Sequence, residues 1–274
     1  MKYQIGLKVG SKYGFGDVKS LIKKGISWGI NFFEITTTDI KDIEFYKNLK
    51  KQKINFGIHV PHAYTPDNPM ALCATLSPYK ERAIKWFKKS IKIAQELNAK
   101  YIIVHPDLSQ IPKGNSRYPE GIKFARNRKE GFNQFIENIK KYHQEIPLLI
   151  EVMPSPNYYN FNLKESLKLH NIIKTNFCFD VDHAFEVDQK INTVIHWYQG
   201  IKKYVEIFHV CDFDPEIRGH LPIGEGKINF NKFFQKIKLN NNQIFILEVL
   251  PNSIKSTEKD LIGSKNKLEQ WLKN

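Results

Sequence analysis

Five strand-like apolar runs in this chain each lead directly into a side chain that can bind a metal. The runs and their polar ends are 101–104 before His105, 148–150 before Glu151, 177–179 before Asp180, 205–208 before His209 and 244–247 before Glu248. A buried strand favours apolar residues, so a carboxylate or imidazole at its end needs a specific partner. Because the pattern recurs on strand after strand, we expect these ends to converge on one site.

Strand-like runs alternate with segments of helical period along the whole chain. The candidate strands are 3–9, 31–36, 55–60, 101–105, 147–152, 177–181, 205–210 and 243–249, and the candidate helices lie near 17–29, 39–52, 78–98, 128–143, 163–175, 187–200, 229–239 and 256–273. Eight such units predict one α/β domain over residues 1–274, a (β/α)8 TIM barrel with its active site at the C-terminal ends of the strands. An open doubly wound sheet is the competing architecture, and it offers no single place where all these ends meet.

The long irregular stretches of the sequence also favour a barrel. They are 61–77, 106–127, 153–162 and 211–227, and all four follow candidate strands. The connections at the opposite ends of the strands are short. Elaborated loops on one face are typical of a barrel whose active site lies there.

Composition indicates a globular protein of a reducing compartment. The 274 residues suit one barrel, 41% of them are hydrophobic, and no Pro-, Gly- or Ser-rich linker divides the sequence. Three cysteines, Cys73, Cys178 and Cys211, have no paired spacing. Without a signal peptide or an apolar stretch of spanning length, the sequence predicts a cytoplasmic protein with no membrane partner.

The net charge of +14 has two interpretations. A basic face for nucleic acid is one of them. The other is a lysine-rich composition spread over the solvated faces of outer helices, and the pairs Lys88–Lys89, Lys140–Lys141 and Lys202–Lys203 lie in such amphipathic segments. The sequence favours the second interpretation, since charge alone argues for solubility rather than a site.

Four of the strand-end residues form a candidate metal set: Glu151, Asp180, His209 and Glu248. Alternation along a strand places Leu149 inward with Glu151 and Cys178 inward with Asp180, which predicts apolar filling below a polar layer. Three carboxylates close together cannot all stay ionised without a cation. The oxygen and nitrogen donors suit Mn²⁺, Zn²⁺, Co²⁺ or Mg²⁺.

Further polar residues fall on the same predicted face. His59 and His62 follow the third candidate strand, His105 ends the fourth, His183 follows Asp180, and His220 lies in the glycine-punctuated loop after the seventh. We interpret His62, His105, His183 and His220 as ligands of a second metal or as groups that orient substrate. Arg218, in the same loop as His220, has a guanidinium suited to a carboxylate or phosphate of a ligand.

At these residues the chain resembles the xylose-isomerase-like TIM barrel superfamily, over nearly its whole length. That superfamily includes sugar and sugar-phosphate isomerases and epimerases and the endonuclease IV class of apurinic/apyrimidinic endonucleases (AP endonuclease family 2). The motifs are Val60-Pro61-His62-Ala63, Val104-His105-Pro106, Ile150-Glu151, Phe179-Asp180-Val181-Asp182-His183-Ala184, His209-Val210-Cys211-Asp212, His220-Leu221-Pro222-Ile223-Gly224-Glu225-Gly226 and Leu247-Glu248. As a set they are specific for the superfamily and not for one activity within it.

The endonuclease branch implies three zinc ions held by nine side chains. Eight of those positions match His62, His105, Glu151, Asp180, His183, His209, His220 and Glu248. The ninth is an aspartate two residues before the loop histidine, where this chain has Arg218, and the segment 152–156 also departs from the endonuclease pattern. The isomerase branch often has a glutamate on the second strand, and Glu34 fits that place, so we interpret it as a further group for a second metal or for substrate.

These departures favour an isomerase or epimerase acting on a small sugar or sugar phosphate. Such an enzyme needs a base and a cation to remove a proton next to a carbonyl. The hypothesis places one divalent metal on the four-residue set, with Glu151 and Glu248 as the proton-transferring pair and Arg218, His183 and His220 on substrate oxygens. The alternative is zinc-dependent hydrolysis of phosphodiesters at abasic DNA, with two or three ions and Glu151 bridging metals. The resemblance is compatible with a homo-oligomer.

Overall fold

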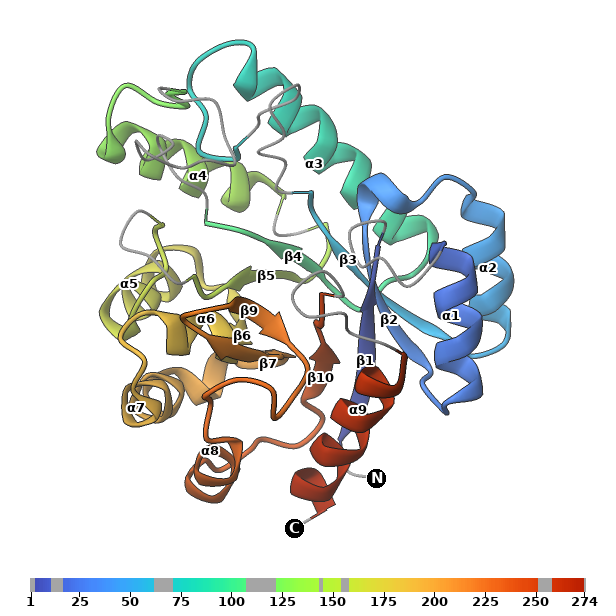
Figure 1. Ribbon diagram of the computed structural model, residues 1–274. Helices are drawn as coiled ribbons and strands as arrows, with labels where there is room; N and C mark the ends of the chain where they lie inside the picture. Colours follow the sequence, from blue (N-terminus) through green and yellow to red (C-terminus); the bar gives the residue numbers. More distant parts are fainter. Residues whose placement is uncertain are drawn as a thin grey trace.

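In the computed structural model, eight parallel strands close into a barrel (Figure 1). The structure describes residues 3–10, 17–61, 71–106, 122–142, 145–153, 158–250 and 258–273. The barrel strands are β1 (Gln4–Val9), β2 (Phe32–Thr36), β3 (Asn55–His59), β4 (Ile102–Val104), β5 (Leu148–Glu151), β6 (Asn176–Asp180), β7 (Val205–Val210) and β10 (Ile244–Leu247). Their order around the barrel is β1-β10-β7-β6-β5-β4-β3-β2, and β1 also pairs with β2. The predicted barrel is therefore confirmed, and the open doubly wound sheet is excluded.

Helices lie around the outside of the strands (Figure 1). They are α1 (Val18–Ser27), α2 (Ile43–Lys51), α3 (Tyr79–Glu96), α4 (Arg128–Tyr142), α5 (Leu163–Ile173), α6 (Val181–Glu186), α7 (Ile191–Ile201), α8 (Phe230–Lys236) and α9 (Glu258–Lys273), with short 3-10 turns η2 (Thr37–Asp39) and η3 (Lys202–Tyr204). Asp17 caps α1, since its side chain accepts the backbone N–H of Ser20 at the first turn. Asp42, Asn162 and Asn229 cap α2, α5 and α8 in the same way.

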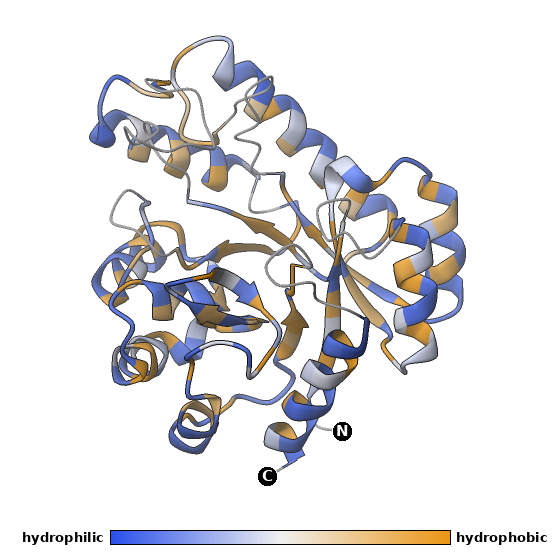
Figure 2. Cartoon of the chain, in the orientation of Figure 1, coloured by the Kyte–Doolittle hydropathy of each residue, from blue (hydrophilic) through white to orange (hydrophobic). Residues whose placement is uncertain are grey.

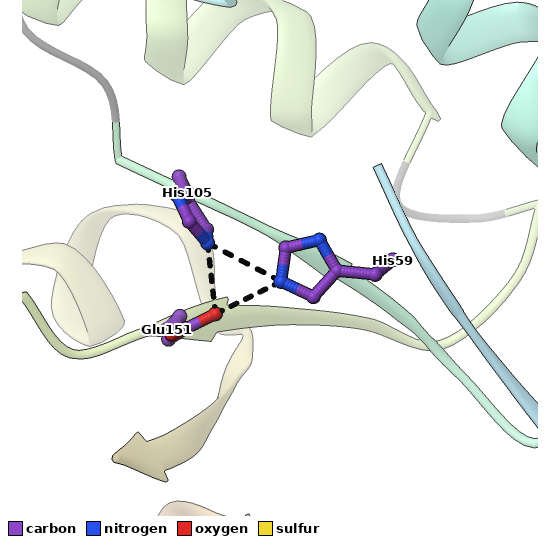
Figure 3. A group of neighbouring side chains, drawn as sticks. All are labelled: His59, His105 and Glu151. Carbon is purple, nitrogen blue, oxygen red and sulfur yellow. Dashed lines mark hydrogen bonds and ion pairs between the residues drawn. The ribbon is translucent and has the colours of Figure 1, made fainter. Parts of the chain in front are cut away.

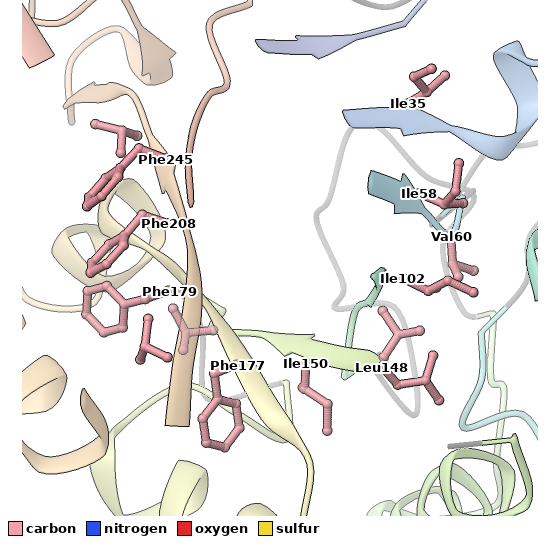
Figure 4. Close-up of a cluster of buried hydrophobic side chains, with 14 of the residues drawn as sticks. Ile35, Ile58, Val60, Ile102, Leu148, Ile150, Phe177, Phe179, Phe208 and Phe245 are labelled. Atoms are coloured by element: carbon pink, nitrogen blue, oxygen red, sulfur yellow. The ribbon is translucent and has the colours of Figure 1, made fainter. Parts of the chain in front are cut away.

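The outward faces of the strands form the main hydrophobic core against the helices. Figure 4 shows part of this core, and Figure 2 shows apolar strands surrounded by helices whose hydrophilic residues face outward. Its strand residues include Ile35, Ile58, Ile102, Leu148, Ile150, Phe177, Phe179, Phe208 and Phe245, all buried. Because side chains alternate along a strand, the residues between these point into the barrel.

The barrel interior holds a second, smaller apolar layer. It consists of Phe32, Tyr101, Ile103, Leu149, Cys178, Ile207 and Ile246. The predicted inward positions of Leu149 and Cys178 are thus confirmed. Two strands contribute a glycine at this level, because a Cβ at Gly57 would overlap the Tyr101 ring and one at Gly6 would overlap Ile246. Large neighbours fill the space that the glycines leave, so the interior below the strand ends is packed.

The loop after β7, which the sequence predicted to be irregular, contains an antiparallel hairpin of β8 (Asp212–Asp214) and β9 (Arg218–Leu221). The buried Asp212 carboxylate organises it by accepting the backbone N–H groups of Phe213, Gly224 and Ile228 at 2.8–3.0 Å. Short polar segments with such side-chain contacts give a weak strand pattern, which explains the missed hairpin. In the described part of the chain, no helix is long and apolar enough to cross a bilayer.

Candidate metal centre

Each barrel strand carries one polar residue, within it or directly after it, in a layer above the apolar interior layer. The eight residues are Lys8, Glu34, His59, His105, Glu151, Asp180, His209 and Glu248, and all are buried. Each lies two positions after an interior residue or a glycine: 6, 32, 57, 103, 149, 178, 207 and 246. The two-residue period of a strand therefore carries every one of these side chains to the same side of the barrel wall.

The four predicted ligands come together around His209. A ligand atom from each of Glu151, Asp180, His209 and Glu248 lies within 4.8 Å of the others. Nδ1 of His209 is 2.7 Å from Glu248 Oε2, 3.5 Å from Glu151 Oε1 and 3.7 Å from Asp180 Oδ2. This arrangement matches the set expected from the sequence.

The position of the proton on His209 leaves its other ring nitrogen free to bind a cation. Its Nε2 lies 3.1 Å from Glu34, whose carboxylate only accepts, so Nε2 carries the N–H and Nδ1 of the neutral ring has a lone pair. That lone pair faces three carboxylates. Among the described residues, His209 Nδ1 and Asp180 Oδ2 are buried with no hydrogen-bond partner. Unpartnered lone pairs of this kind fit a divalent metal ion, and Glu34 fixes the orientation of the His209 ring.

A second ligand set lies beside the first and comes from β3, β4 and β5 (Figure 3). Nε2 of His59, Nε2 of His105 and Oε2 of Glu151 form a triangle with sides of 3.1, 3.0 and 3.2 Å. Nδ1 of His59 donates to the Val60 carbonyl at 2.9 Å, so its Nε2 is an acceptor when the ring is neutral. Burial lowers the pKa of His105 to about 4, so that ring is neutral. A cation between the three atoms would relieve the contact between two acceptors, His59 Nε2 and Glu151 Oε2.

Glu151 belongs to both sets, one oxygen to each. Oε2 faces His59 and His105, whereas Oε1 faces His209 at 3.5 Å and His183 at 3.4 Å. Burial raises the pKa of Glu151, but the adjacent histidines outweigh this effect and hold the pKa well below its usual range. Its carboxylate is therefore ionised and placed to bridge two cations.

Lys8 was missed by sequence reasoning, although a lysine inside the apolar run 3–9 was a usable signal. Its Nζ lies 2.6 Å from Glu248 Oε1 and 3.5 Å from Glu34 Oε1. Burial raises the pKa of both carboxyls, but Lys8 and His209 outweigh it and lower both pKa values. Tyr101 also donates to Glu34 at 3.0 Å. Glu34, predicted as a metal or substrate group, therefore lies behind His209 and pairs with Lys8.

The remaining predicted residues have different outcomes. His183 Nδ1 lies 3.6 Å from Asp180 Oδ2. Burial lowers the pKa of His183, but the nearby carboxylates outweigh this effect and raise the pKa well above its usual value. His220 is 22% exposed at the edge of the centre, 4.0 Å from Glu248 Oε1. Arg218 starts β9, and its side chain lies outside the described residues, as does all of His62. The histidine that the structure places beside His105 and Glu151 is His59.

Comparisons with known proteins agree with this fold. The family model described as xylose isomerase-like TIM barrel matches residues 22–270. Uncharacterized protein MJ1614 of Methanocaldococcus jannaschii is 26% identical over 188 residues, which cover 65% of this chain and 67% of that protein. A D-tagatose 3-epimerase-like protein superposes with a TM-score of 0.75 at 19% identity, covering 98% of this chain and 97% of its own. Endonuclease IV from Thermus thermophilus gives a TM-score of 0.66 at 16% identity, covering 99% of this chain and 98% of its own.

Proposed function

Because the chain belongs to the xylose isomerase-like TIM barrel family, we propose that it is a divalent-metal-dependent phosphodiesterase with a two-ion centre bridged by Glu151. The observation that carries the proposal is that the two carboxylate oxygens of Glu151 face two separate ligand sets. Two adjacent cations sharing a carboxylate are typical of enzymes that hydrolyse phosphate esters. This reverses the order favoured by the sequence, in which the isomerase came first.

The residues present fit two cations. His59, His105 and Glu151 would hold one, and Glu151, Asp180, His209 and Glu248 the other. Bound there, the pair would supply Lewis acidity for the attacking and leaving oxygens of a phosphodiester.

The rest of the chain prepares these ligands. Asp180 Oδ1 accepts the backbone N–H of His183 at the start of α6, which leaves Oδ2 directed into the centre. Glu34 fixes the His209 tautomer, and the Val60 carbonyl fixes that of His59. Ligand rings whose second nitrogen is held in this way need little reorganisation to bind metal.

The substrate class we propose is DNA with an abasic site, following the resemblance to the endonuclease IV class. The net charge of +14 is compatible with a polyanionic substrate as well as with a solvated lysine-rich surface. Contacts from the barrel mouth to the DNA backbone would be salt-dependent.

Sugar isomerisation or epimerisation is the second candidate, and one observation favours it. Glu151 Oε1 and Glu248 Oε2 both approach His209 Nδ1, at 3.5 and 2.7 Å, so one cation there would lie between two carboxylates able to exchange a proton with substrate. In this scheme His59 and His105 would only hold Glu151. The close triangle of their nitrogens with Oε2 argues for a ligand set instead.

A metal count and two assays decide between the candidates. We expect metal-stripped protein reloaded with Mn²⁺ to bind about two ions per chain and to nick a duplex carrying one abasic site, with no turnover of ketohexoses or their phosphates. His59→Gln should lose one ion and Glu151→Gln both. His170→Gln is the matched control, because His170, on α5, bonds to the backbone carbonyl of Thr175 and belongs to neither ligand set. One ion per chain together with sugar turnover and no nicking would refute the proposal.

A further inference from the structure

A third group of donors lies beside the proposed two-ion centre and shares no residue with it. It consists of Asp182 on α6, Cys211 directly after β7 and His220 on β9. Cys211 Sγ is 3.4 Å from Asp182 Oδ2 and 3.4 Å from His220 Nδ1, and the latter two atoms are 3.7 Å apart. Asp182 and Cys211 are fully buried, whereas His220 reaches solvent at the barrel mouth.

The spacing of these atoms suits tetrahedral zinc. Bonds of about 2.3 Å to sulfur and about 2.0 Å to nitrogen and oxygen give ligand-to-ligand edges of roughly 3.3–3.6 Å. The three edges in the structure fall at or just above that range. Asp182 also has a second oxygen, Oδ1, that is buried with no hydrogen-bond partner among the described residues. We propose that Asp182, Cys211 and His220 bind a Zn²⁺ ion with a fourth position open toward the barrel mouth.

The chain is shaped to keep these donors together. His220 adopts the left-handed conformation, with φ of 58°, and its backbone N–H donates to Asp182 Oδ2 at 2.7 Å. A Cβ at the neighbouring Gly219 would overlap both Asp182 carboxylate oxygens, so only glycine lets β9 approach this closely. A non-glycine residue in that conformation is uncommon and persists where surrounding contacts enforce it.

This donor set differs from the one that the family resemblance implies. The nine positions of the endonuclease branch include His183, His220 and an aspartate at the place of Arg218, and neither Asp182 nor Cys211 matches any of them. Here Asp182 supplies the carboxylate and Cys211 a thiolate, whose proton leaves to solvent on binding. Thiolate favours Zn²⁺ and Co²⁺ over Mg²⁺ and Mn²⁺, so the site should select its metal independently of the oxygen-rich centre.

Sulfur makes the site separately measurable, since the other two sets contain only nitrogen and oxygen donors. On titrating metal-stripped protein with Co²⁺, we expect a thiolate-to-cobalt charge-transfer band in the near ultraviolet that Zn²⁺ abolishes. Cys211→Ser should remove the band and one bound ion. Cys73→Ser, at another buried free cysteine, is the matched control and should keep both. Nicking activity reports on the two-ion centre, so its failure and the failure of the third site are distinguishable.

Absence of the band in the unaltered protein, or its survival in Cys211→Ser, would overturn the proposal. Should that variant not fold, the unaltered chain still decides the question. Crystals soaked in Zn²⁺ and measured at the zinc absorption edge should show an anomalous peak between Sγ, Nδ1 and Oδ2, and a map without that peak would refute the site.

Discussion

Lys8 offers a direct test of how charge is balanced in the polar layer. It is buried, 2.6 Å from Glu248 and 3.5 Å from Glu34, and Lys8→Met keeps most of its length while removing the charge. Removing one partner of a buried ion pair costs about 3–5 kcal/mol. For a chain of this size that loss lowers the melting temperature by about 5–9 °C. We expect this loss in metal-free protein.

Metal should recover part of the loss, because a cation on Glu248 compensates the charge that Lys8 leaves. By linkage, a recovery of about 2 kcal/mol equals a gain of about 30-fold in metal affinity. Melting curves with and without metal, together with calorimetric titration, measure both terms. Lys19→Met is the matched control, since its 2.6 Å ion pair with Asp42 is about half exposed and should contribute little to stability. A metal-free Lys8→Met protein as stable as the original, or one that binds metal more weakly, would refute this reasoning.

Two further outcomes are expected. Gly57→Ala should lower the free energy of unfolding by about 1–3 kcal/mol, because its Cβ overlaps the Tyr101 ring and displaces the Tyr101 hydroxyl from Glu34. Gly263→Ala, in open space on α9, is the control and should be neutral or stabilising. Equal melting temperatures for the two variants would contradict the packing argument. For each proton released on binding, metal affinity should rise with pH by about tenfold per pH unit across neutrality. Burial lowers the pKa of His183 and His209, but the surrounding anionic groups outweigh this effect and raise both pKa values. Calorimetry in buffers of different ionisation enthalpy counts these protons, and a pH-independent affinity would contradict the raised pKa values of His183 and His209.

The period of two along the strands explains why so much of the centre was predictable. Once Leu149 is assigned to the interior, Glu151 must follow it, and the same step leads from Cys178 to Asp180 and from Ile207 to His209. The parity also separates His59 from His62. His59 lies two positions after Gly57 on β3, so its side chain enters the interior, and a strict count along 55–60 would have selected it.

Contacts across the barrel could not be predicted in this way. Glu34 and His209 are 175 positions apart, and only closure of the strands brings them to 3.1 Å. Lys8 and Glu248 meet because β1 pairs with β10 at the seam. The distances also depend on the stagger between strands, as in the pairing of Ile246 with His209. A sequence gives the inward parity of each strand, whereas the stagger follows from the packing of the whole barrel.

Closure also explains why the charge balance of the polar layer favours a metal centre over ordinary structural polarity. Four carboxylates, Glu34, Glu151, Asp180 and Glu248, lie in it above a dry apolar layer, and Lys8 is the one ammonium among its eight side chains. The imidazoles relieve this imbalance only when they are protonated. When the rings of His59 and His209 are neutral, their tautomers leave a lone pair on the nitrogen that faces Glu151. Buried charge of one sign is costly unless it is paired. Divalent cations would supply the missing charge at the two places where these lone pairs converge, so folding of this barrel and metal binding are expected to be thermodynamically linked.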